Sequence, residues 1–171
     1  MKNSRTVAIV VALMVAGLAA CGAFYIYKGK GFSITFPKDW EQKEDFMGAA
    51  LIGMSPLDGP GDTLRENVNV AVEKGLPSSI NLKEYYDLST ENVQKLLTDV
   101  EVLDAGETRL DDRPAQWIKF KHRMGEIRLT AMQYYVLKGS RAYVITCTAG
   151  QDTYDAWSDK FENIVGTFRL R

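Results

Sequence analysis

Hydrophobic and polar residues alternate along several segments of this chain, which is the pattern of half-buried β-strands. The first such segment places Phe32, Ile34 and Phe36 on one side of a strand, with Ser33 and Thr35 on the other. The same alternation, or a short apolar run, predicts further strands over residues 49–54, 67–73, 101–109, 115–122, 127–137 and 142–149.

Two other segments repeat their apolar residues every three or four positions, as amphipathic helices do. The first covers residues 82–97, and Asn81 with Glu84 forms a pair typical of a capping box at its start. The second covers residues 153–165 and ends at Gly166, before a short extended tail.

Turn-forming residues separate the predicted strands. Pro, Gly and Asp fill residues 55–66, which predicts a long exposed loop. Asp111-Asp112 and Gly139-Ser140 each predict a tight reverse turn. The strand at 127–137 carries apolar side chains on both sides, so both faces of the sheet need a cover. We therefore predict an α+β fold, an antiparallel sheet of about six to seven strands flanked by helices on both faces.

The N-terminal segment has the features of a bacterial lipoprotein signal. Lys2 and Arg5 precede an apolar stretch of twelve residues, 7–18. The sequence Leu18-Ala19-Ala20-Cys21 then matches a lipobox, in which Cys21 carries the lipid after cleavage. We expect residues 1–21 to be this signal with its lipid-attachment cysteine, and the mature protein to be anchored at the bacterial cell envelope, facing the periplasm or the exterior.

A retained transmembrane helix is the alternative anchor. Residues 7–27 form an apolar stretch of 21 residues, close to the roughly 20 that a helix needs to cross a bilayer. With either anchor, the basic N-terminus places the remaining chain outside the cytoplasm. We expect residues 22–30 to be a short tether and residues 31–171 to be one domain.

The distribution of charge excludes one class of partner. The chain has 21 basic and 22 acidic side chains. Removal of residues 1–20 takes away two basic residues and no acid, which leaves 19 against 22 and a formal net charge of −3. The basic residues are scattered, so the electrostatic footprint of a nucleic-acid-binding protein is missing. We expect no nucleic-acid partner.

Side chains that support catalysis are scarce. His122 is the single histidine, and Cys147 lies in an apolar strand, where a buried thiol is typical. One histidine and one cysteine in different strands do not make a zinc site, and the acidic pairs in the loops match no calcium motif. We expect no enzyme, metal or cofactor. The alternative is an enzyme whose fold brings together Cys147, or an acid pair such as Asp111 and Glu126.

Trp117 is the candidate binding residue. It shares one side of its predicted strand with Lys119 and Lys121, which is not a core pattern. An indole at a sheet edge can contact a partner protein. The alternative is that the lysine stems simply cover the ring.

Three motifs then follow in order along the chain. They are GFSITFPKDW at residues 31–40, LDDRPAQWI at 110–118, and the hairpin YYVLKGSRAYVITCTA at 134–149, which leads into the last helix. Together they resemble the PsbP-like fold and, within it, the DcrB-like bacterial extracytoplasmic proteins, many of which are lipoproteins. The resemblance covers residues 31–170. It implies a sheet between helices and a role in binding, because the family brings no catalytic residue to carry over.

We therefore expect a membrane-anchored, non-enzymatic binding or assembly protein of the bacterial envelope. A sheet face or the loop at 55–66 would contact an envelope protein or an apolar ligand. A chaperone-like holder of apolar segments and an enzyme are the alternatives. A shallow apolar surface favours binding, whereas a deep pocket with perturbed ionisable groups favours the enzyme.

Overall fold

The structure is a computed structural model that describes residues 24–171. The signal segment, the lipobox and Cys21 lie outside the described residues. Within the described range the strands are β1 (Phe24–Gly29), β2 (Phe32–Pro37), β3 (Glu41–Phe46), β4 (Ala49–Met54), β5 (Asn67–Lys74), β6 (Thr98–Leu110), β7 (Arg113–Met124), β8 (Ile127–Lys138), β9 (Arg141–Gly150) and β10 (Arg169–Leu170). The helices are α1 (Leu82–Leu96) and α2 (Tyr154–Gly166).

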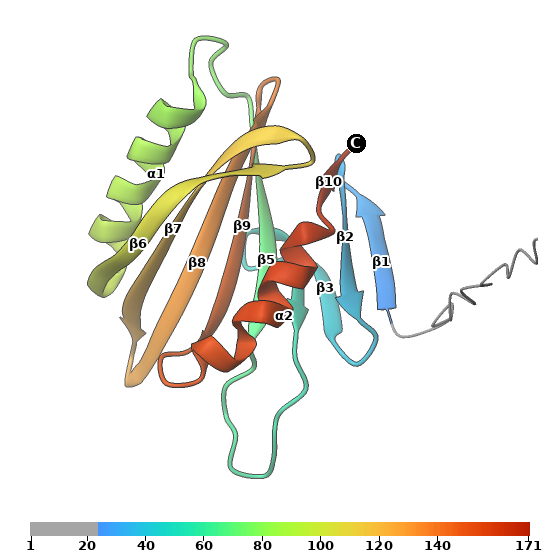
Figure 1. Ribbon diagram of the computed structural model, residues 1–171, viewed down its shortest axis with the longest axis vertical. Helices are drawn as coiled ribbons and strands as arrows, with labels where there is room; N and C mark the ends of the chain where they lie inside the picture. The colour runs from blue at the N-terminus through green and yellow to red at the C-terminus, as the bar shows by residue number, and fades with distance from the viewer. Residues whose placement is uncertain (1–23) are drawn as a thin grey trace, which may run out of the picture.

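The strands form two antiparallel sheets (Figure 1). The larger has the order β3-β4-β5-β9-β8-β7-β6, and the smaller has the order β1-β2-β10. The C-terminal strand β10 pairs with β2, so that Arg169 lies opposite Ser33. The backbone N–H of Leu170 also donates a hydrogen bond of 2.9 Å to the carboxylate of Asp111.

Helices cover both faces of the large sheet, as predicted. On one face, α2 and the small sheet enclose the main core, whose most buried side chains include Phe32, Ile34, Phe36, Val68, Val70 and Phe168. On the opposite face, α1 places Tyr85 and Tyr86 against Tyr135 of β8, with ring centroids 6.3 and 5.4 Å apart. The α+β fold with a sheet of seven strands is therefore confirmed.

Local sequence signals explain several of the boundaries. The Asn81 side chain accepts a hydrogen bond from the Glu84 amide, and the Glu84 carboxylate accepts one from the Asn81 amide, which completes the predicted capping box. In the turn between β6 and β7, Asp111 and Asp112 have φ of 49° and 58°, a conformation that Asp tolerates better than most residues. Thr153 stands at the start of α2 but makes no side-chain capping bond there.

The N-terminal part differs from the prediction. Residues 24–29, expected within a tether, form β1, which pairs with β2 along its whole length. A transmembrane helix over residues 7–27 would therefore have to end before Phe24. The strand β3 was not predicted, because its sequence EQKEDF shows no apolar alternation. It lies at the edge of the large sheet, where charged side chains protect the unpaired backbone.

Candidate functional site

The two faces of β4, β5 and β9 differ sharply in burial. Toward α2 and the small sheet, Leu51, Val70 and Cys147 are at most 1% exposed. Toward the other face, Ile52 and Asn69, which lie opposite each other in the register, are only half-buried. The reason is that α1 packs on β6, β7 and β8 at one side of the sheet (Figure 1). Part of the large sheet therefore has an open face.

An open groove of about 480 Å³ lies on this face. Its sheet residues come from four neighbouring strands and are small or uncharged: Ile52, Asn67, Asn69, Ala71, Leu129 and Thr148. Its rim comes from turns, loops and strand ends, and is apolar except for the imidazole: Phe46, Met47, Leu64, His122 and Met124. We refer to these two sets together as the open groove.

Met47 is the most exposed of these side chains, at 90%. Met47 and Gly48 form the two-residue turn between β3 and β4, with φ of 49° and 84°. Such turns favour Asn-Gly, and a left-handed backbone costs an ordinary residue roughly 1–2 kcal/mol. An apolar side chain held in that conformation and exposed to solvent contributes nothing to the core. Residues of this kind concentrate at functional sites.

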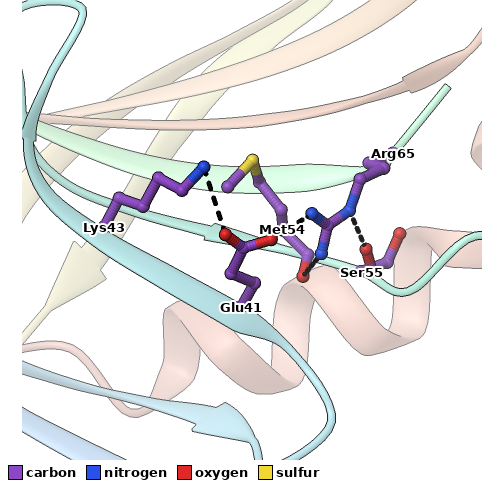
Figure 2. A network of polar contacts seen from close by, with 5 residues as sticks. All are labelled: Glu41, Lys43, Met54, Ser55 and Arg65. Atoms are coloured by element: carbon purple, nitrogen blue, oxygen red, sulfur yellow. Dashed lines mark hydrogen bonds and ion pairs between the residues drawn. The ribbon is translucent and has the colours of Figure 1, made fainter.

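The loop that carries Leu64 is fastened at its base by Arg65 (Figure 2). The guanidinium of Arg65 donates to the backbone oxygens of Ser55 and Met54 and pairs with the carboxylate of Glu41, which also lies 3.1 Å from Lys43. These partners hold the pKa of the Glu41 carboxyl below its ordinary value.

A second contact closes the two ends of the same loop. The hydroxyl of Ser55 donates a hydrogen bond of 3.0 Å to the Glu66 carboxylate, and both residues are buried. Further out, the Asp62 carboxylate accepts from the backbone N–H groups of Asp58 and Leu64. Hydrogen bonds therefore hold the predicted loop at 55–66 both at its base and beside Leu64. The side chain of Leu64 lines the open groove.

The open groove is electrically neutral. Its described lining carries one ionisable group, His122, and burial lowers the pKa of that imidazole below its ordinary value. The Nδ1 atom of His122 is buried and has no hydrogen-bond partner among the described residues. A neutral apolar groove does not attract ions, but it can bury an uncharged apolar group.

The structure does not assemble the catalytic groups that the enzyme alternative named. Cys147 is buried, and burial raises the pKa of its thiol far above the ordinary range. Asp111 precedes β7 and Glu126 follows it, so the twelve residues of that strand separate the two carboxyl groups. This separation is roughly 40 Å at 3.3 Å per residue. Within residues 24–171 no group of three His, Cys, Asp or Glu side chains could hold a metal ion.

Ionisable side chains do gather near His122, but on the far side from the apolar rim. Arg123 lies 2.8 Å from Asp99, and Lys121 lies 3.9 Å from Glu101. These are surface ion pairs between β6 and β7. In these pairs each carboxylate interacts with a basic side chain, and neither carboxylate orients the imidazole of His122.

Trp117 lies on the α2 face of β7, half-buried against the main core. It faces Gly106 of β6, where a β-carbon would come within 3.0 Å of the indole. Lys119, on the same side, places its ammonium 4.5 Å from the ring centroid of Tyr154. Trp117 and the open groove are therefore on opposite faces of the sheet. Its role in binding a partner stays a prediction.

Sequence reasoning missed the groove because the groove depends on strand order. One local signal was available in the Met47-Gly48 turn, where an exposed methionine stands in the left-handed conformation. Turn positions usually hold polar residues or glycine. A second exposed methionine, Met124, lies at the end of β7, directly before the Gly125 turn.

Comparison with solved structures supports the fold. CyanoP of Synechocystis sp., a cyanobacterial PsbP, is 14% identical, with a TM-score of 0.64 over 93% of this chain and 99% of that one. Protein PA94 of Pseudomonas aeruginosa is 13% identical, with a TM-score of 0.64 over 88% and 99%. LpqN of Mycobacterium tuberculosis, described as involved in cell envelope biogenesis, is 13% identical, with a TM-score of 0.63 over 86% and 90%. These likenesses show the fold alone.

The sequence itself matches a family. No protein with a curated description matches it significantly. Among the helices of residues 24–171, none has the length and apolar character needed to cross a membrane. The family model for PsbP-like proteins, however, matches residues 20–170, which is nearly the whole chain. The chain belongs to the PsbP-like protein family.

Proposed function

We propose that this chain is a membrane-anchored binding or assembly protein of the bacterial cell envelope, and that it binds its partner through the open groove. The observation that carries the proposal is the mainly apolar lining of that groove, in which His122 is the one ionisable group among the described residues, with Met47 and Met124 exposed on the rim. The partner would contribute an uncharged apolar group, either from a protein segment or from an apolar ligand.

The proposed location at the cell envelope rests on the N-terminal sequence. The lipobox that ends at Cys21 and the basic residues Lys2 and Arg5 favour export and attachment. The structural neighbour LpqN, described as involved in envelope biogenesis, is consistent with an extracytoplasmic role. We propose a non-catalytic role because the ion pairs of Lys121 and Arg123 lie at the surface, and the Nδ1 atom of His122 has no hydrogen-bond partner among the described residues.

A chaperone-like holder of apolar segments is a second form of the same function. Methionine side chains are flexible and polarisable, so surfaces rich in them accept partners of different shape. Met47 comes from the β3–β4 turn and Met124 from the end of β7, so two separate parts of the chain bring them to the groove. They could adjust independently to an apolar segment placed between them.

Site-specific photo-crosslinking in intact cells tests the proposal. A benzophenone amino acid would replace Met47 or Met124 in the full chain. Leu88 of α1, which is 55% exposed as against 58% for Met124, serves as the control. We expect an adduct of one and the same mass from positions 47 and 124 that position 88 does not give. Asn69→Lys, which puts a charge in the groove at a half-exposed position, should abolish it. Equal adduct patterns from all three positions would refute the proposal.

A further inference from the structure

The strand β1 exposes an unusual amount of apolar surface for the edge of a sheet. Phe24, Tyr25 and Ile26 are consecutive, and they are 61%, 52% and 57% exposed. The small sheet has the order β1-β2-β10, so one side of β1 is unpaired. Proteins usually protect such edges with charges, because an apolar edge promotes aggregation.

The other long edges of the described chain follow that rule. The edge strand β3 reads EQKEDF, and the edge strand β6 carries Glu101, Asp104 and Glu107. The apolar edge at β1 therefore needs a separate explanation. A contiguous exposed apolar surface usually marks a contact with a protein or a membrane.

The apolar surface continues from β1 toward α2. Phe24 lines a groove of about 620 Å³ between β1, β2 and α2, together with Pro37, Ala156 and Ile164. Phe24, Ile26 and Lys28 alternate along β1 and share its outer side, because Tyr27 points into the main core. We call the surface formed by Phe24, Tyr25, Ile26 and this groove the β1 surface.

The position of the β1 surface in the sequence identifies its partner. Phe24 lies three residues after Cys21, a distance of at most about 11 Å along the chain. If the apolar stretch is instead retained as a helix, that helix would have to end before Phe24, so β1 would follow it directly. The β1 surface is thus held at the lipid headgroups, a layer of roughly 5–8 Å on each side of the hydrocarbon core.

From this geometry we infer that the β1 surface lies against the bilayer, with the Phe24 and Ile26 side chains in the interfacial region. The inference rests on the membrane attachment proposed above and holds for either kind of anchor. Aromatic side chains favour that region. Contact of the β1 surface with the bilayer also sets the orientation of the domain. Because α1 and β1 lie at opposite sides of the molecule, α1 faces away from the membrane (Figure 1).

The contact would be mainly apolar. Lys28 lies on β1 and Lys160 lines the adjoining groove, but Asp159 lines that groove as well. The charges largely offset one another, so attraction to anionic lipid is a minor contribution. Binding to a zwitterionic bilayer should therefore resist salt, which separates it from binding by a basic patch.

A fluorescent label on the full-length protein tests the inference. Ile26→Cys would carry an environment-sensitive fluorophore, and Leu88→Cys, with a side chain 55% exposed against 57%, is the matched control. Both would be reconstituted into phosphatidylcholine vesicles with and without a nitroxide on the lipid near the headgroup. Cys147 is buried, and the parent chain without an added cysteine corrects for any label on Cys21.

We expect the label at position 26 to shift its emission to shorter wavelength and to lose most of its intensity with the nitroxide lipid, at low and at high salt. The label at position 88 should do neither. Equal exposure of both labels to water, in protein that still floats with the vesicles, would overturn the inference and leave the membrane attachment standing.

Two further outcomes would also overturn it. Quenching between labels at position 26 of different copies, without quenching by the lipid, would show that β1 instead pairs with a second copy of the chain. Failure of the protein to float with the vesicles would remove the membrane attachment itself, and the inference with it.

Discussion

The ring of Phe36 on β2 packs directly onto Gly53 on β4, at the point where the small sheet meets the large one. A β-carbon at position 53 would lie only 2.3 Å from the Phe36 ring. Gly53 and Phe36 are both buried. The two sheets can approach each other here because β4 has no side chain at this position.

Substitution of this glycine should destabilise the domain. Gly53→Ala forces the Phe36 ring or the β4 backbone to move, and overpacking of this kind costs about 1–3 kcal/mol. The measurement is the free energy of unfolding in urea. Gly61→Ala is the control, since a β-carbon there meets nothing within 4 Å. Equal stability of the two variants would show that the sheets adapt without strain.

Loss of the Arg65 side chain should release the loop without unfolding the domain. Arg65→Met removes three contacts at the base of the 55–66 loop, and we expect amide hydrogen exchange in residues 56–64 to become faster. Lys43→Met removes the other cation beside Glu41 and touches no loop residue, so it should leave exchange unchanged. If exchange were the same in both variants, the contacts that remain, those between Ser55 and Glu66 and those of the Asp62 carboxylate, would be sufficient to hold the loop.

His122 should titrate below an ordinary histidine. Burial lowers its pKa in the folded state, so the stabilisation from its neutral form is present above the unfolded pKa of about 6.5. That stabilisation is lost as the pH falls through the folded pKa. The single imidazole can be followed by NMR in the full chain. A titration midpoint of the His122 imidazole at or above pH 6.5 would contradict the lowering of its pKa by burial.

The same titration should reach the open groove. Protonation puts a charge on its rim, which disfavours an apolar partner. The crosslink yield from position 124 should therefore fall as the pH is lowered through the folded pKa of His122, as located by the NMR titration. His122→Asn should remove this pH dependence, while it persists in a variant with the imidazole intact, such as Leu88→Ala.

The intact mass of membrane-extracted protein should show lipid on Cys21. We expect a chain that begins at Cys21, heavier by a diacylglyceryl or triacyl group, and we expect Cys21→Ala to lack that addition. An unmodified full-length mass, unchanged by Cys21→Ala, would instead identify a transmembrane anchor.

Much of the fold could be predicted because its signals are local. The capping box at Asn81 and Glu84 needs four residues, and the two-sided apolar pattern of β8 predicts a cover on each face. The polar edge strand β3 carries no such signal. Nor does the packing of the two sheets, because it brings together distant segments, as where the Phe32 ring of β2 meets the Tyr143 ring of β9, at 6.2 Å between centroids.

The candidate site could not be predicted in the same way. The open groove collects Met47, Leu64 and Met124 from a turn, a loop and a strand end that are distant in sequence. It is open because α1 covers only β6, β7 and β8, which is set by packing and not by the composition of any one segment. The sequence pattern around Trp117 is unusual within a single strand, whereas the groove combines residues whose proximity no single segment indicates.

The pairing of β10 with β2 has a consequence for the biogenesis of the protein. The first strands to leave the cytoplasm in an N-terminal-first export would be β1 and β2, yet β2 gains its second neighbour only from Arg169 and Leu170. Phe32 likewise packs on Phe168. The small sheet therefore cannot be completed before the last few residues of the chain are present. In an exported chain, this sheet would form only after the C-terminus has crossed the membrane.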